Sequence, residues 1–124
     1  MNTRALKERL YEAIDRSAEA VERYVRDIQQ HAELGFEEHR TAEKMAQFFR
    51  EIGLEPRTGL AVTGMAADLD SGKSGPTIAF MGELDAIVCR QAPYANPETG
   101  AAQQCGHHVQ QRVLLAAAAG FTAS

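Results

Sequence analysis

The stretch TIAFMGELDA, from Thr77 to Ala86, decides the fold class. The strand that it predicts, residues 77–84, is apolar at odd and even positions alike until Gly82, which is typical of a strand buried on both faces of a sheet. A second short apolar segment without helical period, AVTGMAADL at residues 61–69, precedes it, and the turn-rich DSGKSGP joins the two. This short connection predicts an antiparallel pair, because a parallel crossover needs about a dozen residues or more.

Helices are predicted on both sides of these strands. Residues 4–30 form one long helix, since apolar side chains recur there at three- and four-residue spacing with charges between them. After a break at Gly35, a second helix ends near Gly53, a natural C-terminal cap, and a third helix covers residues 109–121. The order helix, helix, antiparallel strand pair, loop, helix predicts part of a layered α/β domain, because two strands alone make a thin sheet.

The composition excludes several classes of function. Of the 124 residues, 44% are hydrophobic and 24% are charged, and the net charge is -4, which is ordinary for one globular domain. Scattered Lys and Arg residues predict no nucleic-acid partner, and no apolar run reaches the roughly 18 residues of a membrane span. The charged N-terminal stretch lacks the apolar block of a signal peptide, so we expect a cytoplasmic protein. Cys89 and Cys105 are too few for a disulfide framework.

A cysteine and two histidines lie close together in QQCGHHVQQR, residues 103–112. Cys105 and His107 can share one metal ion only if the segment is extended or turned, and Gly106 permits that conformation. A helix that begins just after them would favour the thiolate, and thiolate and imidazole both bind zinc. The alternative is a buried free cysteine beside solvated histidines. Spacing alone favours this alternative, because a lone C-x-H lacks the doubled ligand pairs of a structural zinc site.

Two carboxylates follow the predicted buried strand. Glu83 and Asp85 are two residues apart, so they share one side of an extended segment, at a strand end where α/β proteins build sites. A solvated strand end, with Asp85 capping the next turn, is the equal alternative.

Taken in order, four segments resemble a known family. They are HAELGFEEHRTAEKMAQFFREIGLE, TGLAVTGMAADL, GELDA and NPETGAAQQCGHHVQ, and together they run from about residue 20 to the last residue. They resemble the zinc-dependent amidohydrolases of the aminoacylase and carboxypeptidase superfamily. The most similar branch contains the N-acyl-amino-acid amidohydrolases: hippuricases, indoleacetyl-amino-acid hydrolases and aminobenzoyl-glutamate hydrolases. The resemblance implies a zinc-peptidase-like catalytic domain, of which residues 1–124 would be a part without the lid domain.

The resemblance also implies roles for individual residues. Cys105 and His107 match the first two ligands of a two-metal site, and Asp85 matches the acid that orients a ligand. The cofactor would be a divalent metal ion: zinc, manganese, cobalt or nickel. The segment from His31 to Phe36 matches a family segment but is one residue shorter and lacks its proline. Three single positions also depart from the family pattern. Glu83 stands where other branches place a metal-binding histidine, Gln103 where this branch often has histidine, and His108 where many members have aspartate or asparagine.

The family's paired glutamates, which supply the general base and another ligand, and its later histidine ligands have no counterpart in the 124 residues. We therefore expect a part of a metal-dependent amidohydrolase or peptidase that acts on N-acyl amino acids or related small molecules and is inactive by itself. The alternative is a non-enzymatic module that acts through self-association or partner binding. Self-association is expected in both cases, because the unfinished sheet exposes a strand edge.

Overall fold

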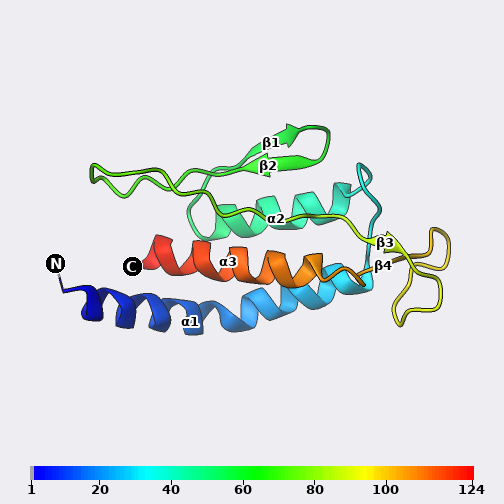
Figure 1. Cartoon of the computed structure of the whole chain (residues 1–124), viewed down its shortest axis with the longest axis horizontal. Helices are drawn as coiled ribbons and strands as arrows, with labels where there is room; N and C mark the ends of the chain where they lie inside the picture. The colour runs from blue at the N-terminus through cyan, green and yellow to red at the C-terminus, as the bar shows by residue number, and fades with distance from the viewer. Residues whose placement is uncertain (1) are drawn as a thin grey trace.

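The computed structural model describes residues 2–124, which form three helices and two small antiparallel strand pairs (Figure 1). The helices are α1 (Thr3–Gln30), α2 (His39–Glu51) and α3 (His107–Ala123). The strands are β1 (Arg57–Leu60), β2 (Gly64–Ala66), β3 (Ile87–Val88) and β4 (Ala101–Ala102). The predicted α/β class and the order of helix, helix, antiparallel strand pair, loop and helix are confirmed.

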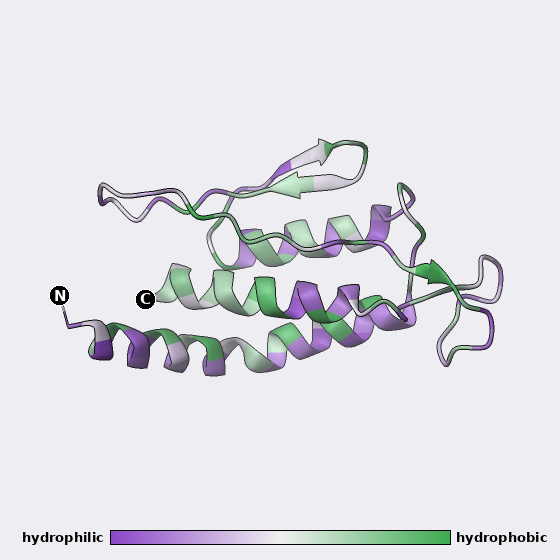
Figure 2. Ribbon diagram, in the orientation of Figure 1, coloured by the Kyte–Doolittle hydropathy of each residue, from purple (hydrophilic) through white to green (hydrophobic). Residues whose placement is uncertain are grey.

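The three helices form the core. α1 and α3 run side by side in opposite directions, and α2 packs against this pair of helices (Figure 1). Gly120 of α3 makes the close approach to α1 possible, because a Cβ atom there would lie 2.8 Å from side-chain atoms of Leu10 and Ile14. The second half of α3 is coloured mostly as hydrophobic (Figure 2). The buried core consists of Val21, Tyr24, Val25, Ile28, Met45, Phe48, Phe49, Leu115 and Ala119.

The first strand pair is a local hairpin, which corrects one prediction. β2 covers only three residues of the predicted strand 61–69, and it pairs antiparallel with β1, not with residues 77–84. Ala61 and Val62 have φ angles of 47° and 83°, so the chain turns sharply where the pattern predicted a strand. Pairing across this short turn closes a smaller loop than pairing across DSGKSGP, and its entropic cost is lower.

The prediction of a buried strand at residues 77–84 is also wrong. The segment is extended, but it belongs to neither strand pair, and the side chains of Ile78 and Met81 are 73% and 89% exposed. It runs alongside α3, where the ring of Phe80 lies 5.9 Å from that of Phe121. A strand that is apolar on both faces needs a layer on each side, and the exposed side chains of Ile78 and Met81 show that the second layer is missing within the described residues.

The second strand pair returns the chain to the start of α3. β3 and β4 pair antiparallel, with Ile87 opposite Ala102 and Val88 opposite Ala101. The loop between them, residues 89–100, therefore folds back on itself (Figure 1). As a result Glu83 and Asp85 lie beside the first turn of α3. No helix in the described part of the chain is long and apolar enough to cross a membrane.

Candidate metal centre

The CGH motif lies at the N-terminus of α3 in a turned conformation. α3 begins at His107, and Gly106 before it has a φ angle of 82°, a left-handed conformation that glycine adopts without steric cost. Cys105 therefore lies outside the helix, as the metal hypothesis requires. The helix begins one residue earlier than the point, near His108 or Val109, where the motif predicted it.

His107 lies between the carboxylates of Glu83 and Asp85. Its Nδ1 atom is 2.8 Å from the backbone oxygen of Asp85 and 2.9 Å from Oδ1 of the same residue. Its Nε2 atom is 3.1 Å from Oε2 of Glu83, and only 12% of the His107 side chain is exposed. The structure thus places His107 against Asp85, and Glu83 joins them.

A neutral His107 ring cannot donate a hydrogen bond to both of these carboxylates. Both Asp85 atoms near Nδ1 are hydrogen-bond acceptors, so Nδ1 carries a proton. In a neutral ring Nε2 is then an acceptor, and it faces a carboxylate oxygen of Glu83, which is also an acceptor. Two arrangements resolve this conflict: a second proton on His107, which makes a plain ion-pair network, or a cation that both atoms bind. The second arrangement matches the way proteins orient metal-binding histidines through their other ring nitrogen.

Cys105 lies apart from this cluster. Among the described residues, the group of His, Cys, Asp and Glu whose ligand atoms lie within 4.8 Å of one another consists of Glu83, Asp85 and His107. Cys105 is exposed, and both it and Cys89 are free thiols. The structure thus brings together His107 and Asp85 of the three predicted site residues, and it adds Glu83.

Glu83 is held by two residues that the sequence did not single out. Gln110 accepts a hydrogen bond from the Glu83 backbone N–H at 3.1 Å and donates one to its carboxylate at 3.2 Å. Gln111 donates to the Glu83 backbone oxygen at 2.8 Å. With His107, these residues occupy positions i, i+3 and i+4 of α3, which share one helix face. This spacing was visible in HHVQQ, but its partner lies 27 residues earlier in the chain.

Gln103 and His108, the two departures from the family pattern in this region, contact each other. The buried side chain of Gln103 accepts a hydrogen bond from the His108 backbone N–H at 3.3 Å. Nε2 of Gln103 and Nδ1 of His108 have no hydrogen-bond partner. Burial, followed by the neighbouring charge of His107, lowers the pKa of His108 below its ordinary value. A neutral His108 therefore adds no positive charge beside His107 near neutral pH.

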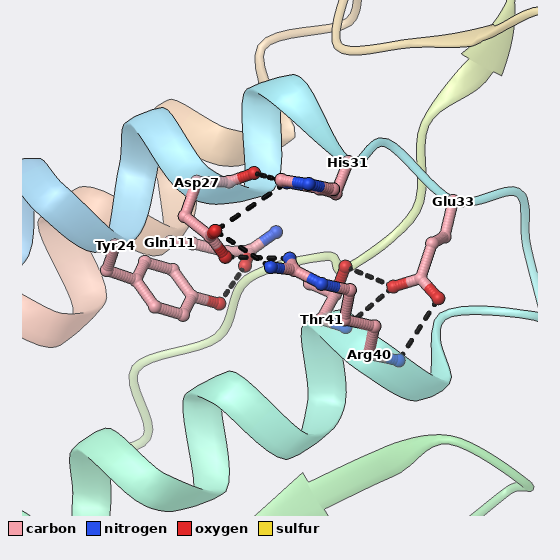
Figure 3. A network of polar contacts seen from close by, with 7 residues as sticks. All are labelled: Tyr24, Asp27, His31, Glu33, Arg40, Thr41 and Gln111. Atoms are coloured by element: carbon pink, nitrogen blue, oxygen red, sulfur yellow. Dashed lines mark hydrogen bonds and ion pairs between the residues drawn. The ribbon is translucent and has the colours of Figure 1, made fainter. Parts of the chain in front are cut away.

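The HAELGF segment has a structural role next to this site. The Glu33 carboxylate accepts hydrogen bonds from the backbone N–H groups of Arg40 and Thr41 at 3.0 and 2.6 Å, and from the Thr41 hydroxyl at 2.6 Å (Figure 3). It thereby caps the N-terminus of α2. The Glu33 backbone oxygen accepts a hydrogen bond from Ala86 N–H at 2.8 Å, and Leu34 forms a parallel bridge with Ala86. The segment therefore fixes the residue that follows Asp85.

An ion pair links α1 to α2 beside this cap. Arg40 donates to both carboxylate oxygens of Asp27, at 2.7 and 2.8 Å (Figure 3). Hydrogen bonding from Arg40 is the main reason that the pKa of Asp27 lies below its ordinary value. His31 is also near Asp27, with Nδ1 2.8 Å from its backbone oxygen. His31 and Glu33 are therefore accounted for by the joint between the helices.

Several of the curated proteins with similar sequences are named as amidohydrolases or other hydrolases. The chain is 28% identical over 121 residues to a putative amidohydrolase, YhaA, of Bacillus subtilis, which is 95% of this chain and 31% of that protein. It is 32% identical over 96 residues to N-acetyl-L-cysteine deacetylase of the same organism, which is 75% of this chain and 23% of that protein. It is 33% identical over 94 residues to hippurate hydrolase of Campylobacter jejuni, which is 73% of this chain and 24% of that protein.

These relatives define the class of the chain. No family model and no solved structure matches it. The chain spans less than a third of the length of each of the three relatives. The relatives and the motifs agree on one class, the amidohydrolases. The chain is similar in sequence to these amidohydrolases, in agreement with the resemblance that its GELDA and CGH segments carry.

Proposed function

We propose that residues 1–124 form part of the catalytic domain of a metal-dependent enzyme that hydrolyses the amide bond of N-acyl amino acids or related small molecules. The observation that carries this proposal is the position of His107, with Asp85 on Nδ1 and Glu83 facing Nε2. The names of two relatives, N-acetyl-L-cysteine deacetylase and hippurate hydrolase, support an N-acyl amino acid as the substrate class.

The residues present fit a divalent metal ion. Zinc takes imidazole nitrogen and carboxylate oxygen at about 2.0–2.2 Å, so two tetrahedral ligands lie about 3.3 Å from each other. The Nε2 atom of His107 and Oε2 of Glu83 are 3.1 Å apart, close to that separation. Imidazole and carboxylate together suit zinc, manganese, cobalt and nickel, so the donor set does not choose among them.

The chain's own residues would divide the work at this site. His107 would bind the metal ion through Nε2, and Asp85 would hold the ring in place through Nδ1. Cys105 is proposed as a further ligand on the strength of the CGH motif, and the N-terminus of α3 would favour its thiolate. When bound, the metal ion supplies Lewis-acid polarisation of the substrate's amide carbonyl.

We expect little hydrolysis from these residues alone. Amide hydrolysis needs a general base that moves the proton of the attacking water. Within the described residues, the cluster offers two carboxylates, and both are engaged with His107. A separate group would therefore have to supply the base.

Titration of the metal-free protein with zinc, followed by calorimetry, tests this proposal. We expect His107→Ala to abolish the binding that the unaltered chain shows, and Cys105→Ser to weaken it. His39→Ala is the matched control, because His39 is an exposed histidine at the start of another helix, α2. Equal affinity of the His107→Ala and His39→Ala variants would refute the metal site.

A second candidate function is self-association, which the exposed segment at residues 77–84 supports. Ile78, Phe80 and Met81 are exposed there, and extended backbone without a partner strand is a template for pairing with another chain. Sedimentation analysis at increasing concentration tests it. We expect a dimer or larger species that Ile78→Lys disperses, and a monomer at every concentration would contradict this candidate.

A further inference from the structure

Every polar group of Glu83 is bonded to one face of α3. Its backbone N–H and its carboxylate contact Gln110, and its backbone oxygen contacts Gln111. The same carboxylate oxygen, Oε2, lies 3.1 Å from Nε2 of His107 and 3.2 Å from Nε2 of Gln110. A solvated glutamate at a strand end needs none of these contacts, so the arrangement calls for a specific explanation.

The buried side chain of Gln111 is held in one conformation. It is 0% exposed, and the Tyr24 hydroxyl donates a hydrogen bond to its Oε1 atom at 2.6 Å. Its Nε2 atom donates to the backbone oxygen of Glu83. Because both ends of the amide are used inside the core, the side chain cannot turn without leaving a buried polar group unpaired. Tyr24 stays a donor, since burial, and then the charge of Asp27, raises its pKa. The main chain at Glu83 is thereby anchored to the core.

Gln110 sets the direction of the carboxylate. The Glu83 side chain is largely exposed and would otherwise occupy several rotamers. The Oε1 atom of Gln110 accepts a hydrogen bond from the Glu83 backbone N–H, and its Nε2 atom donates one to Oε2 of Glu83. These two bonds turn the carboxylate toward His107.

We infer that Gln110 is a positioning residue that holds Glu83 as a metal-ligating carboxylate beside His107, on a main chain that Gln111 anchors. This inference rests on the proposed metal site. In this inference Glu83 binds the metal ion directly, and Gln110 acts on the metal ion only by positioning Glu83. The competing explanation is that the two glutamines only hold residues 82–85 against α3. In that case the affinity for zinc would not depend on Gln110.

The two explanations differ in their effect on zinc affinity. Removing a hydrogen-bond partner of a metal ligand costs about 10- to 100-fold in affinity. A fastening role instead lowers the melting temperature of the metal-free protein and leaves zinc affinity unchanged. The exposed position of Gln110 allows a substitution there without a cavity in the core.

The experiment compares Gln110→Met, Glu83→Gln and Gln47→Met with the unaltered full chain. Methionine keeps the length of glutamine and removes its donor and acceptor. Gln47 is the matched control, because its Nε2 atom also donates to a glutamate, Glu51, at 3.0 Å on an exposed helix face. Each protein is titrated with zinc by calorimetry, and its melting temperature is measured without metal and with saturating zinc.

We expect Gln110→Met to weaken zinc binding by about 10- to 100-fold. Its metal-free melting temperature should match that of the Gln47→Met control, and its zinc-induced rise in melting temperature should be smaller. Glu83→Gln should weaken zinc binding at least as much as Gln110→Met.

Two results would overturn the inference and leave the metal site intact: zinc affinity that depends on His107 but not on Glu83 or Gln110, or a lower metal-free melting temperature of Gln110→Met with unchanged affinity. Absence of zinc binding by the unaltered chain, or binding indifferent to His107→Ala, would overturn both the inference and the proposed function.

Discussion

Two polar clusters join distant parts of this chain, and they are built on opposite principles. In the first, at the joint of α1 and α2, each carboxylate accepts hydrogen bonds from groups that donate to it: Asp27 from the Arg40 guanidinium, and Glu33 from N–H groups and the Thr41 hydroxyl of α2 (Figure 3). In the second, Glu83 and Asp85 both approach His107, a ring that has a single N–H when neutral.

The difference separates a structural cluster from a candidate binding site. The first cluster is satisfied by its own members, so it contributes to stability and needs no ligand. The second has more acceptors than donors, unless a proton or a cation is added. Its members are consequently expected to contribute little to the folding of the metal-free chain and much to metal binding.

The largest expected effect is the loss of the α2 cap. Glu33→Ala removes the acceptor of three hydrogen bonds and leaves the N–H groups of the first turn without a partner. We expect the free energy of unfolding to fall by about 2 kcal/mol, measured by chemical denaturation. Glu37→Ala is the control, because Glu37 is an exposed glutamate of the same loop. A loss no greater than that of the control would show that the cap is unimportant.

Removing the ion pair between the helices should have a smaller effect. Arg40→Met leaves the half-buried Asp27 carboxylate without its two hydrogen bonds from the guanidinium. We expect the free energy of unfolding to fall by about 1–2 kcal/mol. Arg23→Met breaks an exposed pair with Glu19 and should cost at most about 0.5 kcal/mol. Equal losses of unfolding free energy in the two variants would show that the Arg40 pair stabilises the fold no more than an ordinary surface ion pair does.

The same ion pair should make the free energy of unfolding depend on pH in the acidic range. The pKa of Asp27 is lowered in the folded chain, mainly by hydrogen bonding from Arg40, relative to about 3.9 for an unfolded aspartate. A lowered pKa contributes stability that is present above the unfolded value and lost as the pH falls through the folded value. The stability advantage of the unaltered chain over Asp27→Asn should therefore shrink below about pH 4. Unfolding curves of both proteins across acidic pH measure it, and a constant advantage would contradict this assignment.

The sequence predicted the helices well because their pattern is local. Three- and four-residue spacing located α1, and Gly53, with a φ angle of 88°, ends the turn after α2 as expected. The strands were mispredicted for two different reasons. The turn at Ala61 and Val62 uses positive φ angles that no residue type there signals, and residues 77–84 find no strand to pair with in the described chain.

The candidate site was predictable only where motifs carried it. Asp85 and His107 came from the GELDA and CGH motifs, although 22 positions separate them. The roles of Gln110 and Gln111 were not predictable, because a glutamine on a helix face is usually solvated and its partner here is Glu83, on a distant segment. Contacts between side chain and backbone across such distances leave no periodic pattern in the sequence.

The smallest expected effect on folding tests the second cluster directly. In Asp85→Asn the amide oxygen can still accept the hydrogen bond from Nδ1 of His107, so the free energy of unfolding without metal should change by less than about 0.5 kcal/mol. With zinc present the effect should grow, because a neutral amide does not raise the basicity of the ring as a carboxylate does. A roughly tenfold weaker affinity would remove about 1.4 kcal/mol of zinc-induced stabilisation. Asp15→Asn, at an exposed position of α1, is the control. If Asp85→Asn destabilises the metal-free chain as much as the loss of the α2 cap does, the second cluster is structural and the division between the two clusters fails.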